Sequence, residues 1–149
     1  MSTQHILLSM LMLATGIGIP IMATMNGSLG IKLANPFAAS VILFFVAFLI
    51  AVGATLTAGL PSAEGVLRAP KWLMLAGFFV AFYIISITVA GPIIGIGNAV
   101  FLVLLGQIIS TAVIDHFGWL GAPVSPISPQ KLLGIAFMIT GIYLARRVA

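Results

Sequence analysis

The fold of this chain is decided by stretches such as residues 35–57, NPFAASVILFFVAFLIAVGATLT. The stretch has no charged residue, and its apolar run extends from Phe37 to Thr57. A helix needs roughly 20 apolar residues to cross a hydrocarbon core about 30 Å thick. Asn35 and Pro36 mark the helix start, because Asn is a favoured N-cap and Pro is harmless at the first helical position. The stretch therefore predicts a transmembrane helix.

Four further apolar runs flank this one, and they predict an all-α membrane protein. The last run, Leu132–Ala145, is short, but Lys131 and Arg146 lie at its ends and can extend their charged groups to the two membrane interfaces. Continuous apolar runs also argue against transmembrane strands, in which apolar and polar residues alternate. We predict one transmembrane domain over residues 1–149, with helices over residues 6–25, 36–58, 71–90, 95–115 and 130–147.

The composition excludes several classes of function. Hydrophobic residues make up 62% of the chain and charged residues 5%, which is typical of a membrane protein rather than a soluble domain. The six Lys and Arg residues lie between or at the ends of the apolar runs, so we expect them to meet lipid phosphates and not nucleic acid. The chain has no Cys, and His5 and His116 have no partners at metal-binding spacing. We predict no metal site, no cofactor and no catalytic residue, and hence no enzyme.

Glycine and proline interrupt the apolar runs at three places. In the first run, Gly16–Pro20 predicts either a broken helix that lines a substrate path or a simple packing kink. Gly91 and Pro92 predict the end of the third helix, followed by an irregular segment over residues 93–98 at membrane depth. Residues 118–130 contain three prolines and predict a stiff surface loop.

The fourth run carries the most informative polar pattern. Gln107, Thr111 and Asp115 recur every four residues, so they form one stripe along a helix. Gly106 and Ser110 lie beside the stripe and permit a close neighbour. Because a polar stripe in a membrane helix is costly against lipid, we expect Gln107 and Thr111 to face protein or a water-filled cavity. Gln107, near the middle of the run, is the best candidate for contacting a substrate.

Other polar and small residues allow more than one interpretation. Asp115 either pairs at the interface with a cation or with His116, or responds to protons or cations. Asn26 either lines a substrate path or belongs to a polar helix end. Tyr83 is a further candidate for contacting a substrate. Gly134 and Gly141, seven residues apart, mark a smooth face suited to helix packing or dimer formation.

The order of these motifs resembles a known family. The segments Met25–Gly30, Ala69–Trp72, Gly106-Gln107 and Ile114–Gly118, followed by Gly141 and Arg146, are similar to the YdcZ-type family of the drug/metabolite transporter superfamily. The resemblance implies a five-helix half-transporter of the bacterial inner membrane that pairs into a ten-helix dimer. It also implies that Asn26, Asn98, Gln107 and Asp115 occupy the polar positions of the family pattern. This chain has Lys71-Trp72 where relatives often have Trp-Trp.

These observations favour a secondary transporter protomer that moves a small organic solute by alternating access. We expect Asn26, Asn98 and Gln107 to supply hydrogen bonds near the membrane midplane. A non-transporting accessory or assembly subunit is the main alternative, followed by a channel. The substrate, the coupling ion and the direction of transport do not follow from the sequence.

The distribution of basic residues predicts an antiparallel homodimer. With five helices the two termini lie on opposite sides, and each side then has three basic residues, so no excess sets the orientation. The protomer is therefore predicted to insert both ways, with a parallel dimer as the competing arrangement. One side holds Arg68, Lys71 and Lys131, and the other holds Lys32, Arg146 and Arg147.

Overall fold

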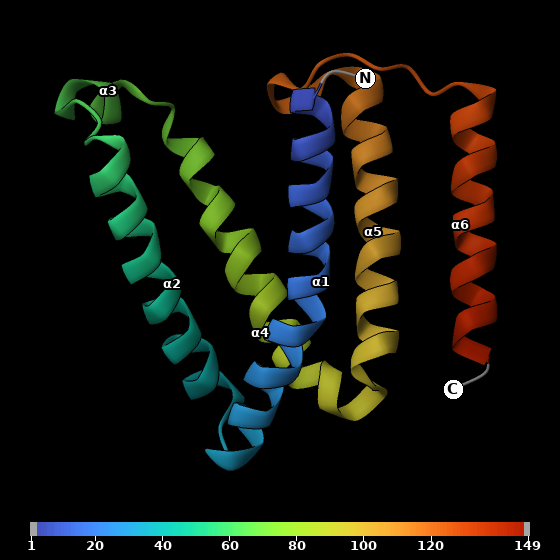
Figure 1. Cartoon of the computed structure of the whole chain (residues 1–149), viewed down its shortest axis with the longest axis horizontal. Helices are drawn as coiled ribbons and strands as arrows, with labels where there is room; N and C mark the ends of the chain where they lie inside the picture. The colour runs from blue at the N-terminus through green and yellow to red at the C-terminus, as the bar shows by residue number, and fades with distance from the viewer. Residues whose placement is uncertain (1–2, 148–149) are drawn as a thin grey trace. The chain divides into compact units, whose positions relative to one another are not determined.

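The computed structural model describes residues 3–147, and the described part of the chain folds into helices without a β-strand (Figure 1). The chain divides into two compact units, one ending at Ile96 and the other beginning at Gly97, and each is described by itself. The first unit contains α1 (Thr3–Lys32), α2 (Pro36–Ala58), α3 (Ala63–Arg68), the 3-10 helix η1 (Lys71–Leu75) and α4 (Ala76–Ile94), and the second contains α5 (Ile96–Phe117), the 3-10 turn η2 (Trp119–Gly121) and α6 (Pro129–Arg147).

The helices confirm the five-helix membrane fold expected from the apolar runs. By length and composition, α1, α2, α5 and the continuous segment Lys71–Ile94 are each able to cross a membrane. The fifth helix, α6, carries the shorter apolar segment Pro129–Ala145. The side chain of Arg146, expected to extend to the interface beyond this segment, lies outside the described residues.

Side-chain caps define the starts of two of these helices. Asn35 Oδ1 accepts hydrogen bonds from the backbone N–H groups of Phe37 and Ala38, both at 3.0 Å, and Pro36 begins α2. Ser128 Oγ accepts from the N–H of Lys131 at 3.1 Å and caps α6. These side chains satisfy donors that have no partner inside the helix, so each start is fixed by local chemistry.

Of the two alternatives for the first helix, a break or a packing kink, the break is wrong. α1 is helical from Thr3 to Lys32 and contains Pro20. A proline within a helix removes one backbone hydrogen bond, here to the carbonyl of Gly16, and membrane helices tolerate such a loss. The predicted end at Met25 is also wrong, because the helix continues for two further turns. Asn26 and its polar neighbours therefore lie within α1 and not in a loop after it.

The irregular segment predicted over residues 93–98 is also wrong in extent. α4 continues through Gly91 and Pro92 to Ile94, and α5 begins at Ile96. The break is confined to Gly95, with φ 87° and ψ 134°. Glycine adopts positive φ without the steric cost that a side chain would add, so one residue is enough to separate the two helices.

The core of the first unit lies where α1, α2 and α4 converge. Figure 1 shows α1 and α2 meeting at their short connection, with the C-terminal part of α4 beside them. A Cβ atom on Gly30 would lie 3.1 Å from the Cα of Pro36, and one on Gly27 would lie 3.3 Å from the Cγ of Pro92. Glycines are therefore required for this close approach. Buried residues gather here, namely Ala23, Asn26, Gly27 and Gly30 of α1, Ala39 and Ser40 of α2, and Ile84, Ile87, Thr88 and Gly91 of α4.

The second unit is held together by the connection between its two helices. After α5, two residues have left-handed φ values: Gly118, just before η2, at 63°, and Leu120, within η2, at 60°. An extended segment then leads to Ser128, so the predicted loop is present but contains a helical turn. α6 buries little of its surface, and Ile142, at 8% exposure, is its buried apolar residue among those described.

Candidate functional site

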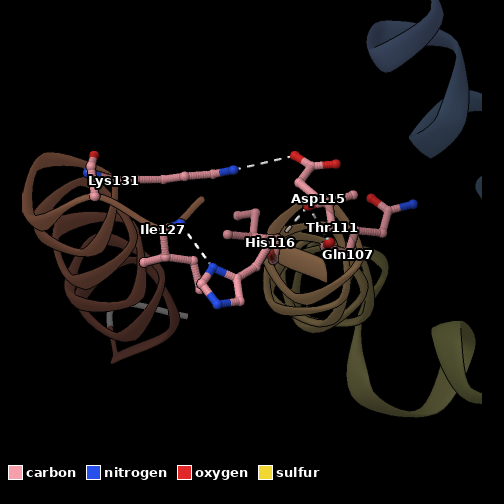
Figure 2. Close-up of polar contacts among 8 residues, drawn as sticks. Gln107, Thr111, Asp115, His116, Ile127 and Lys131 are labelled. Carbon is pink, nitrogen blue, oxygen red and sulfur yellow. Dashed lines mark hydrogen bonds and ion pairs between the residues drawn. The ribbon is translucent and has the colours of Figure 1, made fainter. Parts of the chain in front are cut away.

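The polar stripe predicted for the fourth transmembrane helix lies on α5. Gln107 is near the middle of this 22-residue helix, with Thr111 and Asp115 one and two turns farther along (Figure 2). The side chains of Gln107 and Thr111 are exposed in the protomer. The Thr111 hydroxyl donates to the carbonyl oxygens of Gln107 at 2.8 Å and Ile108 at 3.1 Å. Its proton is therefore engaged by its own helix, which leaves the hydroxyl oxygen as an acceptor.

Asp115 ends the stripe in an ion pair with the following helix. Lys131 Nζ lies 3.2 Å from Asp115 Oδ2, and the two side chains are 32% and 39% exposed respectively (Figure 2). Of the two interfacial partners expected for Asp115, the structure shows the cation and not His116. A partly exposed pair of this kind contributes little stability, about 0–1 kcal/mol, but it fixes where the start of α6 lies relative to the end of α5.

His116 instead holds the connection between α5 and α6. Its Nδ1 accepts a hydrogen bond of 3.1 Å from the backbone N–H of Ile127. The ring also meets Phe117 edge-on, with centroids 4.7 Å apart, and Phe117 stacks on Trp119 at 5.2 Å. Among residues 3–147 no three His, Cys, Asp or Glu side chains gather where they could hold a metal ion.

Asn26 lies in the first unit and is bonded to another helix. Its Nδ2 donates to Thr88 Oγ1 at 2.7 Å, and the Thr88 hydroxyl donates in turn to the carbonyl of Ile84 at 2.6 Å. Asn26 is 5% exposed and Thr88 is 2% exposed. Sequence reasoning missed the role of Thr88 as the partner of Asn26. A substrate contact by Asn26 stays a prediction.

A small hollow adjoins this buried pair. Its volume is about 280 Å³, and its wall includes Thr88 together with small and apolar residues of all three converging helices. The other lining residues are Gly27, Gly30, Ile31, Pro36, Val89, Pro92 and Ile93.

The remaining predicted site residues have varied surroundings. The phenol oxygen of Tyr83 on α4 is buried and has no hydrogen-bond partner among the described residues. Asn98 is partly buried in the first turn of α5. A Cβ atom on Gly134 or Gly141 of α6 would meet nothing within 4 Å, so the smooth face is open. Their roles in binding and packing stay predictions.

A comparison with known protein families decides the relationship suggested by the sequence. Residues 7–144 match the family described as "Putative inner membrane exporter, YdcZ". The chain belongs to this family. The match includes every predicted site residue, from Asn26 to Gly141. The comparisons with curated proteins and with solved structures give no match.

Membership in the YdcZ family establishes the general class of the protein. The family is one of inner-membrane exporters and not of enzymes, and the five apolar helices agree with a multi-pass protein of that membrane. The family description names no substrate and assigns no role to individual residues. The roles of Gln107, Asp115 and their neighbours are therefore inferred from their positions and contacts in the structure.

Proposed function

We propose that this YdcZ-family protein is the protomer of a secondary transporter that exports a small neutral or zwitterionic organic solute by alternating access. The observation that carries the proposal is the exposed amide of Gln107 near the middle of α5. An unpaired amide in hydrocarbon costs several kcal/mol, about 4–8 kcal/mol on transfer from water to cyclohexane. Gln107 is therefore expected to face a water-filled path or a polar ligand.

The charges near the stripe support an uncharged or zwitterionic solute. Asp115 is at the end of α5 and is already paired with Lys131. The other acidic residue of the chain, Glu64, pairs with Arg68 at 2.6 Å on the short helix α3. Gln107 thus has no charged residue within one turn on α5, and a buried ion without a compensating charge is strongly disfavoured. An amide recognises a solute through hydrogen bonds instead.

The other predicted substrate contacts differ in how available their polar atoms are to a solute. Tyr83 is a further predicted contact in the first unit, because its buried phenol oxygen has no hydrogen-bond partner among residues 3–147. Thr111 offers an acceptor oxygen, and Asn98 offers an amide in the first turn of α5. Asn26 is engaged by Thr88 in this conformation, so it reaches a solute after that bond opens.

The transporter is proposed to act as an antiparallel homodimer of ten helices. Three basic residues are expected on each side of the membrane, so both orientations are allowed. Two inverted copies supply the inverted repeat on which many alternating-access transporters are built. Many large apolar side chains of α1, α2 and α4 are exposed in the protomer, which leaves extensive surface for lipid and for a second copy.

The proposal is tested first by finding a ligand and then by measuring flux. Purified protein is screened by thermal shift against a metabolite panel, because a ligand at 100 times its Kd raises stability by about 2.7 kcal/mol. Uptake of the selected solute into proteoliposomes is then compared for the wild type, Gln107→Ala and the matched control Gln130→Ala. Gln130 is also exposed but lies in the first turn of α6.

We expect saturable flux that falls by about fivefold to 160-fold in Gln107→Ala, because loss of a hydrogen bond to a buried polar group costs about 1–3 kcal/mol. Gln130→Ala should transport like the wild type. Flux that does not saturate would favour a channel. If no solute moves through any preparation that folds, the accessory-subunit alternative replaces the transporter.

A further inference from the structure

The end of α5 gathers the contacts that hold the next helix in place. The backbone N–H of Ser125 donates to the carbonyl of Asp115 at 2.8 Å, and that of Ile127 donates to His116 Nδ1 at 3.1 Å. Lys131 at the start of α6 pairs with the Asp115 carboxylate at 3.2 Å. Two consecutive residues of α5 therefore hold the connecting loop at two points and α6 at a third.

These contacts matter because α6 has little other attachment within its unit. No Cα atom of α6 lies within 8 Å of a Cα atom of α5 among the described residues. Most side chains of α6 are exposed, and its glycines have open space around them. The position of the start of α6 relative to α5 thus depends on the connection and on the Asp115–Lys131 pair.

We propose that Asp115 and His116 form a pH-sensitive latch, in which neutral His116 holds the loop before α6 and protonated His116 releases it. His116 is then a positioning residue, which acts on α6 through Ile127. The inference concerns the end of α5 and not the solute path, and it does not depend on the proposed transport activity.

The hydrogen bond fixes the chemical state of the imidazole. Nδ1 accepts from an N–H group, so it carries no proton, and the neutral ring carries its proton on Nε2. A second proton would convert Nδ1 into a donor that faces the Ile127 N–H. The hydrogen bond would be lost and replaced by a repulsive contact. Histidine is the side chain that normally changes charge between about pH 5 and 8, and this is the range in which the latch is to be tested.

The charged residues near His116 lie on both helices of this unit. Among the described side chains of this unit, the charged ones are those of Asp115, which precedes His116 on α5, and of its partner Lys131 on α6, and the loop from Gly118 to Ser128 has no ionisable side chain. Protonation of His116 therefore acts on the start of α6 through the hydrogen bond to Ile127, and the Asp115–Lys131 pair remains as the second attachment.

A spin label at residue 125 measures this release because, among the hydrogen bonds of residues 3–147, only the backbone bond to Asp115 restrains the labelled segment once the His116 bond to Ile127 is lost. The chain has no Cys, so Ser125→Cys provides a single labelling site, and it keeps the backbone N–H that bonds to Asp115. The Ser125 side chain is exposed and can carry the label. A second preparation labelled at Ala63→Cys on α3, also exposed, reports any general effect of acid. Spectra are recorded at about pH 8 and about pH 5.5, on either side of the usual histidine range.

We expect the ratio of mobile to immobile label at residue 125 to rise about threefold to tenfold on acidification, the range that corresponds to loss of one hydrogen bond. The label at residue 63 should not change. His116→Asn keeps an acceptor oxygen close to the position of Nδ1 without a titrating ring, so its loop should stay immobile at both pH values. His116→Phe keeps a ring beside Phe117 but has no acceptor, so its loop should be mobile at both.

Three results would overturn the latch. One is a wild-type loop whose mobility does not depend on pH. Another is a pH response that persists in His116→Asn, which would place the titration on Asp115 instead. The third is a His116→Phe loop as immobile as the wild type at about pH 8. If His116→Phe does not fold, the wild type and His116→Asn decide the question between them.

Discussion

The buried hydrogen bond between Asn26 and Thr88 gives a quantitative prediction about stability. The bond joins α1 to α4 at 2.7 Å, and both residues are almost completely buried. We expect Thr88→Val to lower the free energy of unfolding by about 1–3 kcal/mol, because it leaves the buried Asn26 Nδ2 without an acceptor. Thr88→Ser keeps the hydroxyl and loses one methyl group, so it should cost no more than about 1 kcal/mol.

A double-mutant cycle isolates the bond itself. Asn26→Ala removes the donor, but the Thr88 hydroxyl still donates to the carbonyl of Ile84, so that group is not left with an unpaired proton. Interhelical hydrogen bonds in membrane proteins contribute about 0.6 kcal/mol on average and up to about 1.7 kcal/mol. We expect the coupling energy between Asn26→Ala and Thr88→Val to lie in this range.

Reversible unfolding by SDS in mixed micelles measures the four proteins of the cycle and the Thr88→Ser control. Additive effects of the two substitutions, with no coupling energy, would show that the bond contributes nothing to the fold. A Thr88→Ser protein as unstable as Thr88→Val would show that packing of the methyl group contributes as much to stability as the hydroxyl does. Additivity of the two substitutions would refute the assignment of Asn26 to a structural contact in this conformation.

Three further substitutions test other contacts. Tyr83→Phe should leave the free energy of unfolding in micelles unchanged within about 0.5 kcal/mol, since the phenol oxygen has no hydrogen-bond partner in the described part of the chain, and should reduce solute flux if that oxygen binds the solute. Gly30→Ala should lower the free energy of unfolding by about 1–3 kcal/mol, because its Cβ would lie 3.1 Å from the backbone of Pro36. The control Gly53→Ala, with open space around it, should not lower it. Equal melting temperatures for the two variants would contradict this packing. Asn35→Ala should lower the free energy of unfolding by about 1 kcal/mol, because it removes the side-chain cap of α2. Asn35→Asp keeps a capping oxygen and should retain most of the stability. An Asn35→Asp protein as unstable as Asn35→Ala would argue against the cap.

The sequence predicts the helices best where local chemistry decides their ends. The predicted helix over residues 36–58 has the observed bounds of α2, because a charge-free run follows an Asn cap and a proline. The same local reasoning failed at Pro20 and at Gly91-Pro92. Pro20 was interpreted as a break or a kink and Gly91-Pro92 as a helix end, but a membrane helix tolerates a proline when one lost backbone bond is its main consequence.

The polar residues show the limit of sequence reasoning more clearly. The stripe of Gln107, Thr111 and Asp115 followed from helical spacing, since residues four apart share a face. The partners of Asn26 and Asp115 did not, because they lie 62 and 16 residues away along the chain. The acceptor role of His116 was missed for the same reason. Such contacts depend on how helices and loops return to one another, which spacing within a single helix does not encode.

The central claim, transport by an antiparallel pair, is tested most directly by solute flux through protomers of fixed orientation. Two Lys residues added to one side of the protein should fix one orientation, and two added to the other side should fix the opposite one. Flux is measured in proteoliposomes prepared from cells that express each biased copy alone or both together. The account predicts negligible flux from either copy alone and restored, saturable flux from the pair. Wild-type flux from a single biased copy would contradict it and would favour a parallel dimer or a monomer.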